Sequence, residues 1–329
     1  MSLAFVFPGQ GSQSIGMLAE LAAGDATVRA CFDEASHVLG YDLWQLAQAG
    51  PPERLNATEC TQPAMLAAGI ATWRVWQGRG GALPVLVSGH SLGEFTALVV
   101  AGVLPYAQAI DLVRYRAQLM QEAVPLGTGA MAAILGLDDA GVEAACAEAA
   151  QGAVVEAVNY NSPGQVVIAG ETAAVGRAME AARARGAKRA VLLPVSVPAH
   201  SSLMLGAAQR LGARLADLPL RPPQIRYVSA VDAREHREPD DIRATLVRQL
   251  ASPVRWSQTV QGLLASGAHC IIECGPGKVL TALNRRIERG PQLAALALED
   301  AAGLTAALAA APGGVAPAAT HTVGERHAG

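Results

Sequence analysis

The sequence has few charged and few aromatic residues for its length. Of its 329 residues, 16% are Asp, Glu, Lys or Arg, 4% are aromatic and 51% are hydrophobic. A chain of this size and hydrophobic content can bury a large core, in one large domain or in two unequal ones. The formal net charge is −3, which excludes the overall positive field that holds nucleic acid or an anionic membrane. We therefore expect neither nucleic acid nor a membrane as a partner.

The five cysteines fit no disulfide framework and no metal site. Their number is odd, and the sequence has no Cys-x-x-Cys pair and no Cys/His spacing typical of zinc. Free cysteines suit a reducing compartment, so we expect the cytoplasm. The N-terminal MSLAFVF lacks the basic residues of a signal peptide. The uncharged segment Phe95–Ile110 contains Pro105 and is shorter than the roughly 20 residues that span a bilayer, so we expect no membrane span.

Strand-like and helix-like segments alternate along much of the chain. The apolar run LAFVF ends at a Pro-Gly turn, as a buried strand does. Helical patterns follow over 26–39 and 61–77, and the short strand-like PVLV then leads directly into the helix-compatible EFTALVVAG. This alternation predicts an α/β fold with a short parallel sheet, similar to the α/β-hydrolases.

A different order of elements occupies residues 127–195. The segments there are typical of strand, helix, strand, turn, strand, helix and strand, with the last strand over 189–197, which is the ferredoxin-like β-α-β-β-α-β unit. The tail has Ala, Pro, Gly and Thr without apolar periodicity. We therefore predict three parts. They are a discontinuous α/β-hydrolase-like catalytic domain over 1–125 and 198–310, an inserted ferredoxin-like subdomain over 126–197, and a disordered tail over 311–329.

The segment Gly89-His90-Ser91-Leu92-Gly93 has the GxSxG spacing of a serine nucleophile on a sharp strand-to-helix turn. The turn strains the serine backbone, and small neighbours leave room for it. The helix that follows points free N–H groups toward the oxyanion that forms when the serine attacks a carbonyl. The spacing predicts that Ser91 attacks an acyl group, but lipases, esterases, thioesterases and acyltransferases all share it.

A serine hydroxyl needs a base to take its proton, and seven histidines are available. His200 follows a strand end and precedes a helix, a position that faces the crevice at the strand ends of an α/β sheet. It is the predicted base, with a structural histidine bonded to nearby backbone as the alternative. We expect His90, beside the nucleophile, to point elsewhere. The others are assigned to surface, core or tail positions: His37, His236, His269, His321 and His327.

No aspartate stands in the usual Ser, Asp, His order to orient this histidine. Asp111 lies three residues before Arg114 on a predicted helix, where the two can form an ion pair. Asp138 and Asp139 fit a helix cap. We therefore expect the histidine to be oriented by a backbone carbonyl or by an amide.

Seven stretches of the sequence form an ordered set of motifs. They are FVFPGQGSQSIGML, GHSLGE, LVRYRAQLMQEAVPLGTGAMAAILGL, VNYNSPGQVVIAG, LPVSVPAHSSLM, VRQLASPVRW and CGPGKVLTALNRRI. In this set, over about residues 3–310, the sequence closely resembles the bacterial malonyl-CoA:acyl-carrier-protein transacylases of type II fatty acid synthesis. GxSxG alone is weak evidence, whereas the ordered set is specific to this acyltransferase family. One departure is Ser229, where the family more often has asparagine.

The resemblance implies roles for individual residues. Ser91 would be the nucleophile, and His200 would be the general base toward Ser91 and the general acid toward the departing thiol. The backbone carbonyl of Gln249 would hold the His200 ring. Arg116 would bind the free carboxylate of the malonyl group. The oxyanion hole would consist of two donors, the side chain of Gln10 and the backbone N–H of Leu92.

Helical periodicity by itself leaves two arginines as candidates for carboxylate binding. At about 100° per residue, Arg114 and Arg116 lie on opposite borders of the apolar stripe that contains Val113 and Ala117. Either arginine could lie at the rim of a pocket. A guanidinium binds a carboxylate through two hydrogen bonds, which would select malonyl over acetyl groups. A solvated helix arginine is the alternative.

The resemblance also implies a ping-pong reaction. Ser91 would take the malonyl group from malonyl-CoA, and the phosphopantetheine thiol of holo-acyl carrier protein would then remove it. No metal or redox cofactor is expected because the thioester is already activated, and we expect a monomer. Three alternatives stay open: a free-standing acyltransferase of a trans-acting polyketide synthase, a serine thioesterase or hydrolase, and a scaffold that only binds carrier protein. Four basic residues could contact coenzyme A phosphates or the carrier protein, or could be solvated: Lys188, Arg189, Arg285 and Arg286.

Overall fold

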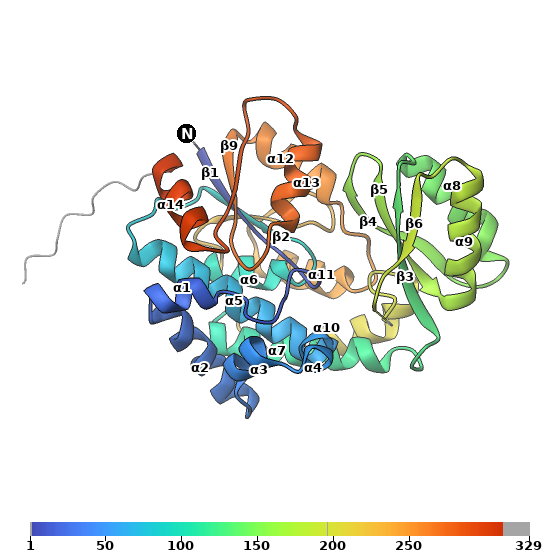
Figure 1. Cartoon of the computed structure of the whole chain (residues 1–329). Coiled ribbons are helices and arrows are strands. Elements are labelled where there is room, and N and C mark those ends of the chain that lie inside the picture. The colour runs from blue at the N-terminus through green and yellow to red at the C-terminus, as the bar shows by residue number, and fades with distance from the viewer. Residues whose placement is uncertain (1, 196, 312–329) are drawn as a thin grey trace, which may run out of the picture.

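Two sheets organise the chain, and each has its own helices (Figure 1). The structure is a computed structural model that describes residues 2–195 and 197–311. The larger sheet has the strand order β10-β9-β1-β2-β7-β8, and the smaller sheet has the order β4-β5-β3-β6. Apart from Ala311, the predicted tail over 311–329 lies outside the described residues.

The larger sheet is parallel except at one edge. Its strands are β1 (Ser2–Phe7), β2 (Leu86–Gly89), β7 (Arg226–Val228), β8 (Glu235–His236), β9 (Ala268–Glu273) and β10 (Ala294–Ala297). The neighbouring pairs are parallel as far as β7, and β8 runs antiparallel to β7 at the edge. Five of the six residues of β1 are buried. A parallel strand that is covered on both faces has such a continuous apolar sequence.

Helices cover both faces of the larger sheet. Their bounds are α1 (Ala19–Gly24), α2 (Thr27–Leu39), α3 (Leu43–Ala49), α4 (Pro52–Asn56), α5 (Thr58–Gly78), α6 (Gly93–Val100), α7 (Tyr106–Glu122), the 3-10 helix η1 (Ser202–Met204), α10 (Leu205–Ala216), α11 (Pro239–Gln249), α12 (Trp256–Ala265), α13 (Val279–Ile287) and α14 (Ala301–Ala310). Phe5 and Phe7 of β1 pack in a core that includes α2, α5, α6 and α7, whereas Val6 packs in a second core with α12 and α13. Side chains of a strand alternate between its faces, so one strand contributes to both cores.

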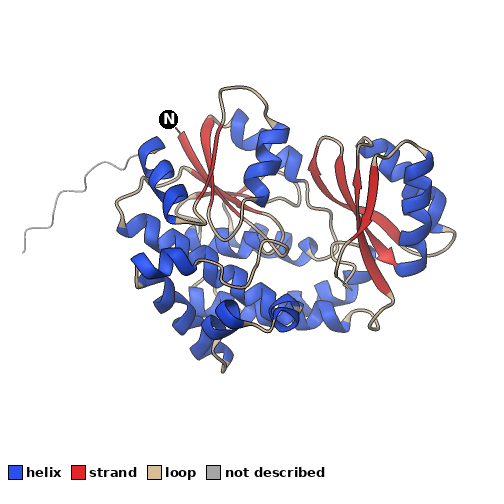
Figure 2. Cartoon of the chain, viewed as in Figure 1, coloured by secondary structure: helices blue, strands red, loops and turns tan. Residues whose placement is uncertain are grey.

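The smaller sheet is antiparallel, and its two helices lie on one face of it (Figure 2). Its elements follow the order β3 (Gly129–Leu135), α8 (Asp139–Ala150), β4 (Val155–Ser162), β5 (Gln165–Glu171), α9 (Thr172–Ala184) and β6 (Arg189–Leu192). The Asp138 side chain caps α8 by accepting a hydrogen bond from the Gly141 N–H. These elements share a separate hydrophobic core, and on that basis we propose that residues 126–197 form an inserted subdomain.

The predicted α/β fold, with a mainly parallel sheet and a second sheet, is confirmed. One strand is shorter than expected: β6 ends at Leu192, five residues before the predicted end at Val197. The Leu193 N–H still bonds to the Met131 carbonyl at 2.9 Å. The next donor on that side, the Val195 N–H, bonds instead to the Leu193 carbonyl at 2.8 Å in a tight turn at Pro194, so the ladder stops there.

Hydrogen bonds join the smaller sheet to a loop of the larger part of the chain. The Val254 N–H donates to the Val158 carbonyl at 2.8 Å, and the Tyr160 N–H donates to the Val254 carbonyl at 2.9 Å. Strand β4 is therefore bonded to the segment between α11 and α12. Within the described residues, no helix has the length and apolar character needed to cross a membrane.

Candidate active site

A strained turn at the end of β2 carries Ser91. Its φ angle is 53°, in the left-handed region that non-glycine residues rarely adopt. The glycines on either side are required by close contacts: a Cβ on Gly93 would lie 1.9 Å from the Phe7 carbonyl oxygen, and one on Gly89 would lie 1.9 Å from the Gly93 carbonyl carbon. The turn therefore packs α6 directly against β1 and β2, which places the hydroxyl at the N-terminus of α6.

The predicted base lies beside this serine. His200 is only 4% exposed, and its Nε2 is 2.7 Å from Ser91 Oγ. Its Nδ1 is 2.8 Å from the Gln249 carbonyl oxygen at the end of α11. Since that oxygen can only accept, the proton is on Nδ1 and Nε2 accepts from the serine hydroxyl. Of the two orienting groups expected from the sequence, the one found here is a backbone carbonyl.

Burial and charge keep the His200 ring neutral. Burial is the main cause that lowers the pKa of His200, and the positive charge of Arg116 lowers it further, to about 3. The ring is therefore unprotonated at Nε2 over the physiological pH range, as a general base must be.

A buried arginine points at the same hydroxyl. Arg116 is 1% exposed, and its Nη2 lies 3.3 Å from Ser91 Oγ. Its Nη1 donates to Gln62 Oε1 at 2.9 Å and its Nη2 to Gln249 Oε1 at 3.0 Å. Burial lowers the pKa of Arg116 to about 10, so the group remains a cation at neutral pH. Among the described residues no carboxylate oxygen lies within 4.0 Å of its nitrogens.

The structure separates the two arginine candidates on α7. Arg114 donates to Asp111 at 2.5 Å, and its side chain is 37% exposed. Asp111 also pairs with Arg214 at 2.9 Å. Only Arg116 of the pair lines the pocket that contains Ser91. Periodicity could not make this choice, because it gives the angle around the helix and not what packs against each side.

Two glutamine side chains hold the arginine, and sequence reasoning missed both roles. Gln249 donates from Nε2 to the Ser91 carbonyl at 3.0 Å, in addition to its contacts with Arg116 and His200. Gln62 is 1% exposed on α5. The available signal for Gln62 was its place directly before the apolar run PAMLAAGIA, since a polar group on a buried helix needs a partner.

The pocket around Ser91 has a volume of about 120 Å³. Pockets for drug-sized ligands measure about 300–1,000 Å³, so this one suits a short acyl group. Gln10 and Leu92, the two residues expected to bind the oxyanion, both line it. No oxygen of the described residues accepts a hydrogen bond from the Leu92 N–H. That donor, at the start of α6, is free for a substrate oxygen.

The neighbouring histidine is bonded to the smaller sheet. His90 lines the pocket, and its ring Nε2 is 2.8 Å from Asn161 Oδ1 on β4. Burial lowers the pKa of His90. As expected, its polar contact is directed away from Ser91.

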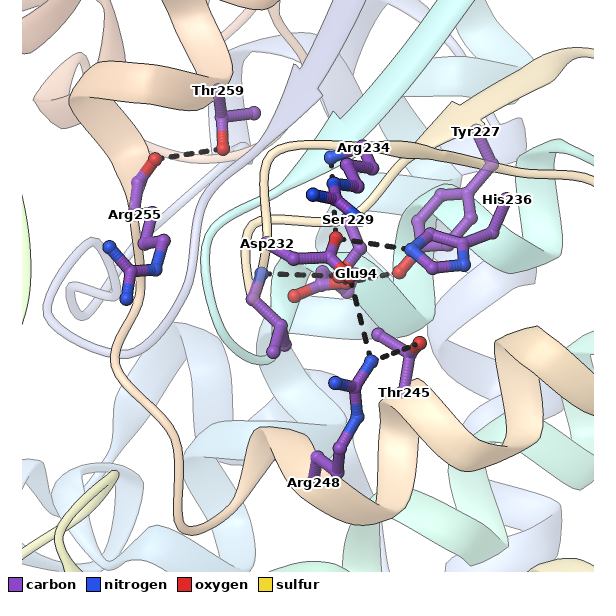
Figure 3. Close-up of polar contacts among 11 residues, drawn as sticks. Glu94, Tyr227, Ser229, Asp232, Arg234, His236, Thr245, Arg248, Arg255 and Thr259 are labelled. Atoms are coloured by element: carbon purple, nitrogen blue, oxygen red, sulfur yellow. Dashed lines mark hydrogen bonds and ion pairs between the residues drawn. The ribbon is translucent and has the colours of Figure 1, made fainter.

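A buried acid, Glu94, lies in the first turn of α6 (Figure 3). Tyr227 on β7 and Ser229, which directly follows β7, both donate to Glu94 Oε2, the latter at 2.8 Å. Burial raises the pKa of the Glu94 carboxyl. Ser229, the departure from the family pattern, therefore has a buried hydrogen-bonding role without touching the pocket.

The four basic residues named from the sequence lie outside the pocket lining. Arg286 on α13 donates to Gln165 Oε1 of the smaller sheet at 2.6 Å, and Arg285 donates to the Ala295 carbonyl at 2.8 Å. Each of these two guanidinium groups therefore already has a partner in the chain.

The assembled groups define one chemistry. A serine hydroxyl bonded to a neutral histidine can attack a carbonyl carbon, and free N–H groups at a helix N-terminus can stabilise the oxyanion. A buried guanidinium without a carboxylate partner suits a substrate that brings a negative charge. The site therefore fits an activated acyl group with a free carboxylate.

Comparisons with known proteins agree on one family. Residues 4–302 match the family described as acyl transferase domain. The malonyl CoA-acyl carrier protein transacylase of Salmonella typhimurium is 55% identical over 93% of this chain and 98% of its own length, and that of Bacillus subtilis is 42% identical over 91% and 93%. Two solved structures are also similar. An acyl carrier protein S-malonyltransferase from Vibrio cholerae has a TM-score of 0.90 and 55% identity over 93% of this chain and 99% of its own. A malonyl-transacylase solved in complex with a type II polyketide acyl carrier protein has a TM-score of 0.92 and 54% identity over 94% of this chain and 100% of its own.

Proposed function

The chain belongs to the acyl transferase domain family, and from this premise we propose how its residues transfer a malonyl group from malonyl-CoA to acyl carrier protein. The chain is an [acyl-carrier-protein] S-malonyltransferase that supplies malonyl-carrier protein to fatty acid synthesis. Its substrate is malonyl-CoA and its protein partner is holo-acyl carrier protein.

In the first half-reaction Ser91 attacks the thioester carbonyl of malonyl-CoA. His200 takes the hydroxyl proton at Nε2, with Nδ1 held by the Gln249 carbonyl. The carbonyl oxygen gains negative charge, and the Leu92 N–H and the Gln10 side chain stabilise it. His200 then returns the proton to the coenzyme A sulfur as the C–S bond breaks, which leaves a malonyl ester on the serine.

The second half-reaction reverses these roles. The phosphopantetheine thiol of the carrier protein attacks the malonyl ester while His200 takes the thiol proton, and the proton then returns to Ser91 Oγ. No redox or metal chemistry is required, because the malonyl group only passes from the sulfur of an activated thioester to the serine oxygen and then to another sulfur, with no change in oxidation state. All groups named come from one chain, which supports a monomer as the working unit. Five free cysteines suit a reducing compartment such as the cytoplasm.

One observation carries the choice of malonyl over neutral acyl groups. It is the buried cation of Arg116, 3.3 Å from the proposed nucleophile and without a carboxylate partner within the described residues. A buried charge without a partner is costly, and the malonyl carboxylate would provide the partner. A hydrolase for neutral esters would not require this arginine.

The nucleophile is tested by trapping the acyl-enzyme. After brief exposure to malonyl-CoA without carrier protein, intact-protein mass spectrometry should find one malonyl adduct. Ser91→Ala should abolish it, because no other nucleophile shares this base. An adduct that persists in the Ser91→Ala protein would assign the reaction to another residue.

Transfer and hydrolysis are separated by a second measurement. If the ester waits for a carrier thiol, malonate release should be much slower than the formation of malonyl-carrier protein. Both rates can be measured in one assay with labelled malonyl-CoA. Malonate release that is faster than transfer at ordinary carrier-protein concentrations would show that the chain acts as a thioesterase.

A further inference from the structure

A carboxylate from the smaller sheet binds the loop that carries the proposed base. Glu156 lies on β4. Its Oε2 accepts a hydrogen bond from the Ser202 N–H at 2.7 Å, and its Oε1 accepts one from Ser202 Oγ at 2.7 Å. Ser202 is two residues after His200 and is the first residue of η1. Its N–H is one of the donors that the start of a helix leaves without an internal partner.

The side chain that caps η1 therefore comes from the smaller sheet and not from the loop that carries His200. Ser201, which precedes η1, makes no side-chain cap to it and instead donates from Oγ to the Pro198 carbonyl at 2.7 Å. A carboxylate at the start of a helix is also favoured by the helix dipole. Glu156 therefore satisfies two donors of Ser202 across 46 residues of sequence.

The direction of the Glu156 side chain follows from the pleat of β4. Val155 and Ala157 pack in the core under α8 and α9. Glu156 lies between them and projects from the opposite face of the sheet. On that face the larger part of the chain approaches β4 (Figure 1), and α12 and α13 both contact it.

The backbone of His200 is in a conformation that needs external support. Its φ angle is 67°, and a non-glycine residue keeps such a conformation only where its surroundings determine it. On one side, the His200 N–H donates to the Leu250 carbonyl at 3.0 Å, next to the carbonyl that binds the ring. On the other side, Ser202 is held by Glu156.

We propose that Glu156 is a positioning residue for acyl transfer: it holds Ser202 so that His200 keeps the backbone conformation from which Nε2 reaches Ser91 Oγ. The inference rests on the proposed function, in which His200 is the base. Glu156 does not line the pocket, so it acts through His200 and not on the substrate. A misplacement of about 1 Å in a reacting group can cost about 100-fold in rate.

The experiment compares Glu156 with a matched carboxylate of the same sheet. Glu171 ends β5, and its Oε1 accepts a hydrogen bond from the Val154 N–H at 2.9 Å. It too binds a backbone N–H, but it holds no residue of the His200 loop. Glu156→Ala, Glu156→Gln and Glu171→Ala are made in the full chain. The kcat and KM for malonyl transfer and the thermal midpoint are then measured for each.

The expected result is a loss in kcat in the Glu156 variants and none in Glu171→Ala. In Glu156→Ala, kcat falls about 10- to 100-fold, while KM for malonyl-CoA stays nearly unchanged because the pocket lining is intact. Glu156→Gln recovers part of the loss, since its amide oxygen can still accept from the Ser202 N–H. Glu171→Ala loses stability and keeps the kcat of the unchanged protein.

Two results would overturn the inference. One is an equal kcat for Glu156→Ala and Glu171→Ala per folded molecule, which would make Glu156 only a structural cap. The other is a raised KM with unchanged kcat, which would place its effect on substrate binding. If Glu156→Ala does not fold, Ser202→Ala decides instead, because it keeps the N–H bond and removes only the hydroxyl bond; an unchanged kcat in that variant overturns the inference.

A parallel measurement on Ser91→Ala separates this inference from the proposed function. Activity in Ser91→Ala would refute the proposed mechanism whatever Glu156 does. An inactive Ser91→Ala protein together with a fully active Glu156→Ala protein would refute the positioning role alone.

Discussion

At the scale of single residues, the charge of Arg116 is expected to decide which acyl group is transferred. In Arg116→Ala, kcat/KM for malonyl-CoA should fall, because loss of one partner of a buried charge pair costs about 2–5 kcal/mol. That cost corresponds to roughly 30-fold to several-thousand-fold. Acetyl-CoA has no carboxylate, so its slow transfer should be spared or improved. The measurement is the steady-state kinetics of both acyl-CoAs.

Arg114→Ala is the control for this comparison. Its guanidinium pairs with Asp111 at the surface, with a side chain that is 37% exposed. Such pairs contribute little to stability, so both transfers should stay close to those of the unchanged protein. If Arg116→Ala slows malonyl and acetyl transfer by the same factor, Arg116 has a structural role and does not select the acyl group.

The neutral state of His200 leads to a prediction about pH. Its pKa is lowered from 6.5 to about 3, first by burial and then by Arg116. The base should therefore remain unprotonated well below pH 6.5, and the rate of Ser91 acylation should be nearly constant from pH 8 down to about pH 5. Rapid-quench measurements of the malonyl adduct follow this rate directly. A half-loss near pH 6.5 would show an ordinary histidine and contradict the expectation.

At the scale of elements, a buried acid connects the end of β9 to the start of α13. Glu273 is fully buried, and its two oxygens accept hydrogen bonds from the Leu280 N–H at 3.0 Å and the Thr281 N–H at 2.7 Å. Burial raises the pKa of Glu273 from 4.5 to about 7, against the effect of these donors. The same carboxyl therefore caps α13 and makes the stability of the β9–α13 connection depend on pH.

The stability of the protein should fall with rising pH because of Glu273. The folded-state pKa is above the unfolded value, so this stabilising contribution is complete below about pH 4.5 and is lost as the pH rises through about 7. The difference is on the order of 3 kcal/mol. Urea unfolding from pH 5 to 8 should show this loss in the unchanged protein and not in Glu273→Gln.

The control for that prediction is an exposed acid. Glu122→Gln removes a surface ion pair with Arg210, in which the two side chains are 58% and 56% exposed. It should leave the pH dependence of unfolding as it was. A Glu273→Gln protein whose stability falls with pH as steeply as that of the unchanged protein would mean that another group titrates in this range.

At the scale of the whole molecule, all five thiols are enclosed by the packed cores. Each cysteine is free and buried, and burial raises the pKa of Cys146 and of Cys274 to about 12. The thiolate is the reactive form, so a thiol reagent should label none of them quickly in the folded protein. In guanidinium chloride it should label all five.

Absorbance with a disulfide reagent counts the reactive thiols in both states. Rapid reaction of one or more thiols in the folded protein would show that a core opens locally without global unfolding. The site of labelling, found by peptide mass spectrometry, would tell which sheet opens.

Local patterns in the sequence determined the order of the elements and the position of the turn that carries Ser91. Apolar runs and helical periodicity depend on neighbours a few residues apart, so they predicted β1, α2, α5 and the elbow at Ser91 close to their observed bounds. The pattern of motifs also indicated His200, and the structure brings it next to Ser91. The end of β6 was predicted too late, because the apolar run continues past the turn at Pro194, where the Val195 N–H bonds to the Leu193 carbonyl and leaves the ladder.

Contacts between residues distant in sequence could not be derived from periodicity or spacing, and the tertiary structure decides them. Arg116 and Arg114 are equivalent by periodicity, and only the packing of α7 against α5 and the end of α11 places Arg116 between Gln62 and Gln249. The family resemblance implied the Gln249 carbonyl as the group that holds His200, and the structure places it there because α11 ends beside His200. The bond from Glu156 to Ser202 joins two sheets. Each of these contacts depends on how whole elements pack, and that information is not contained in any short stretch of the chain.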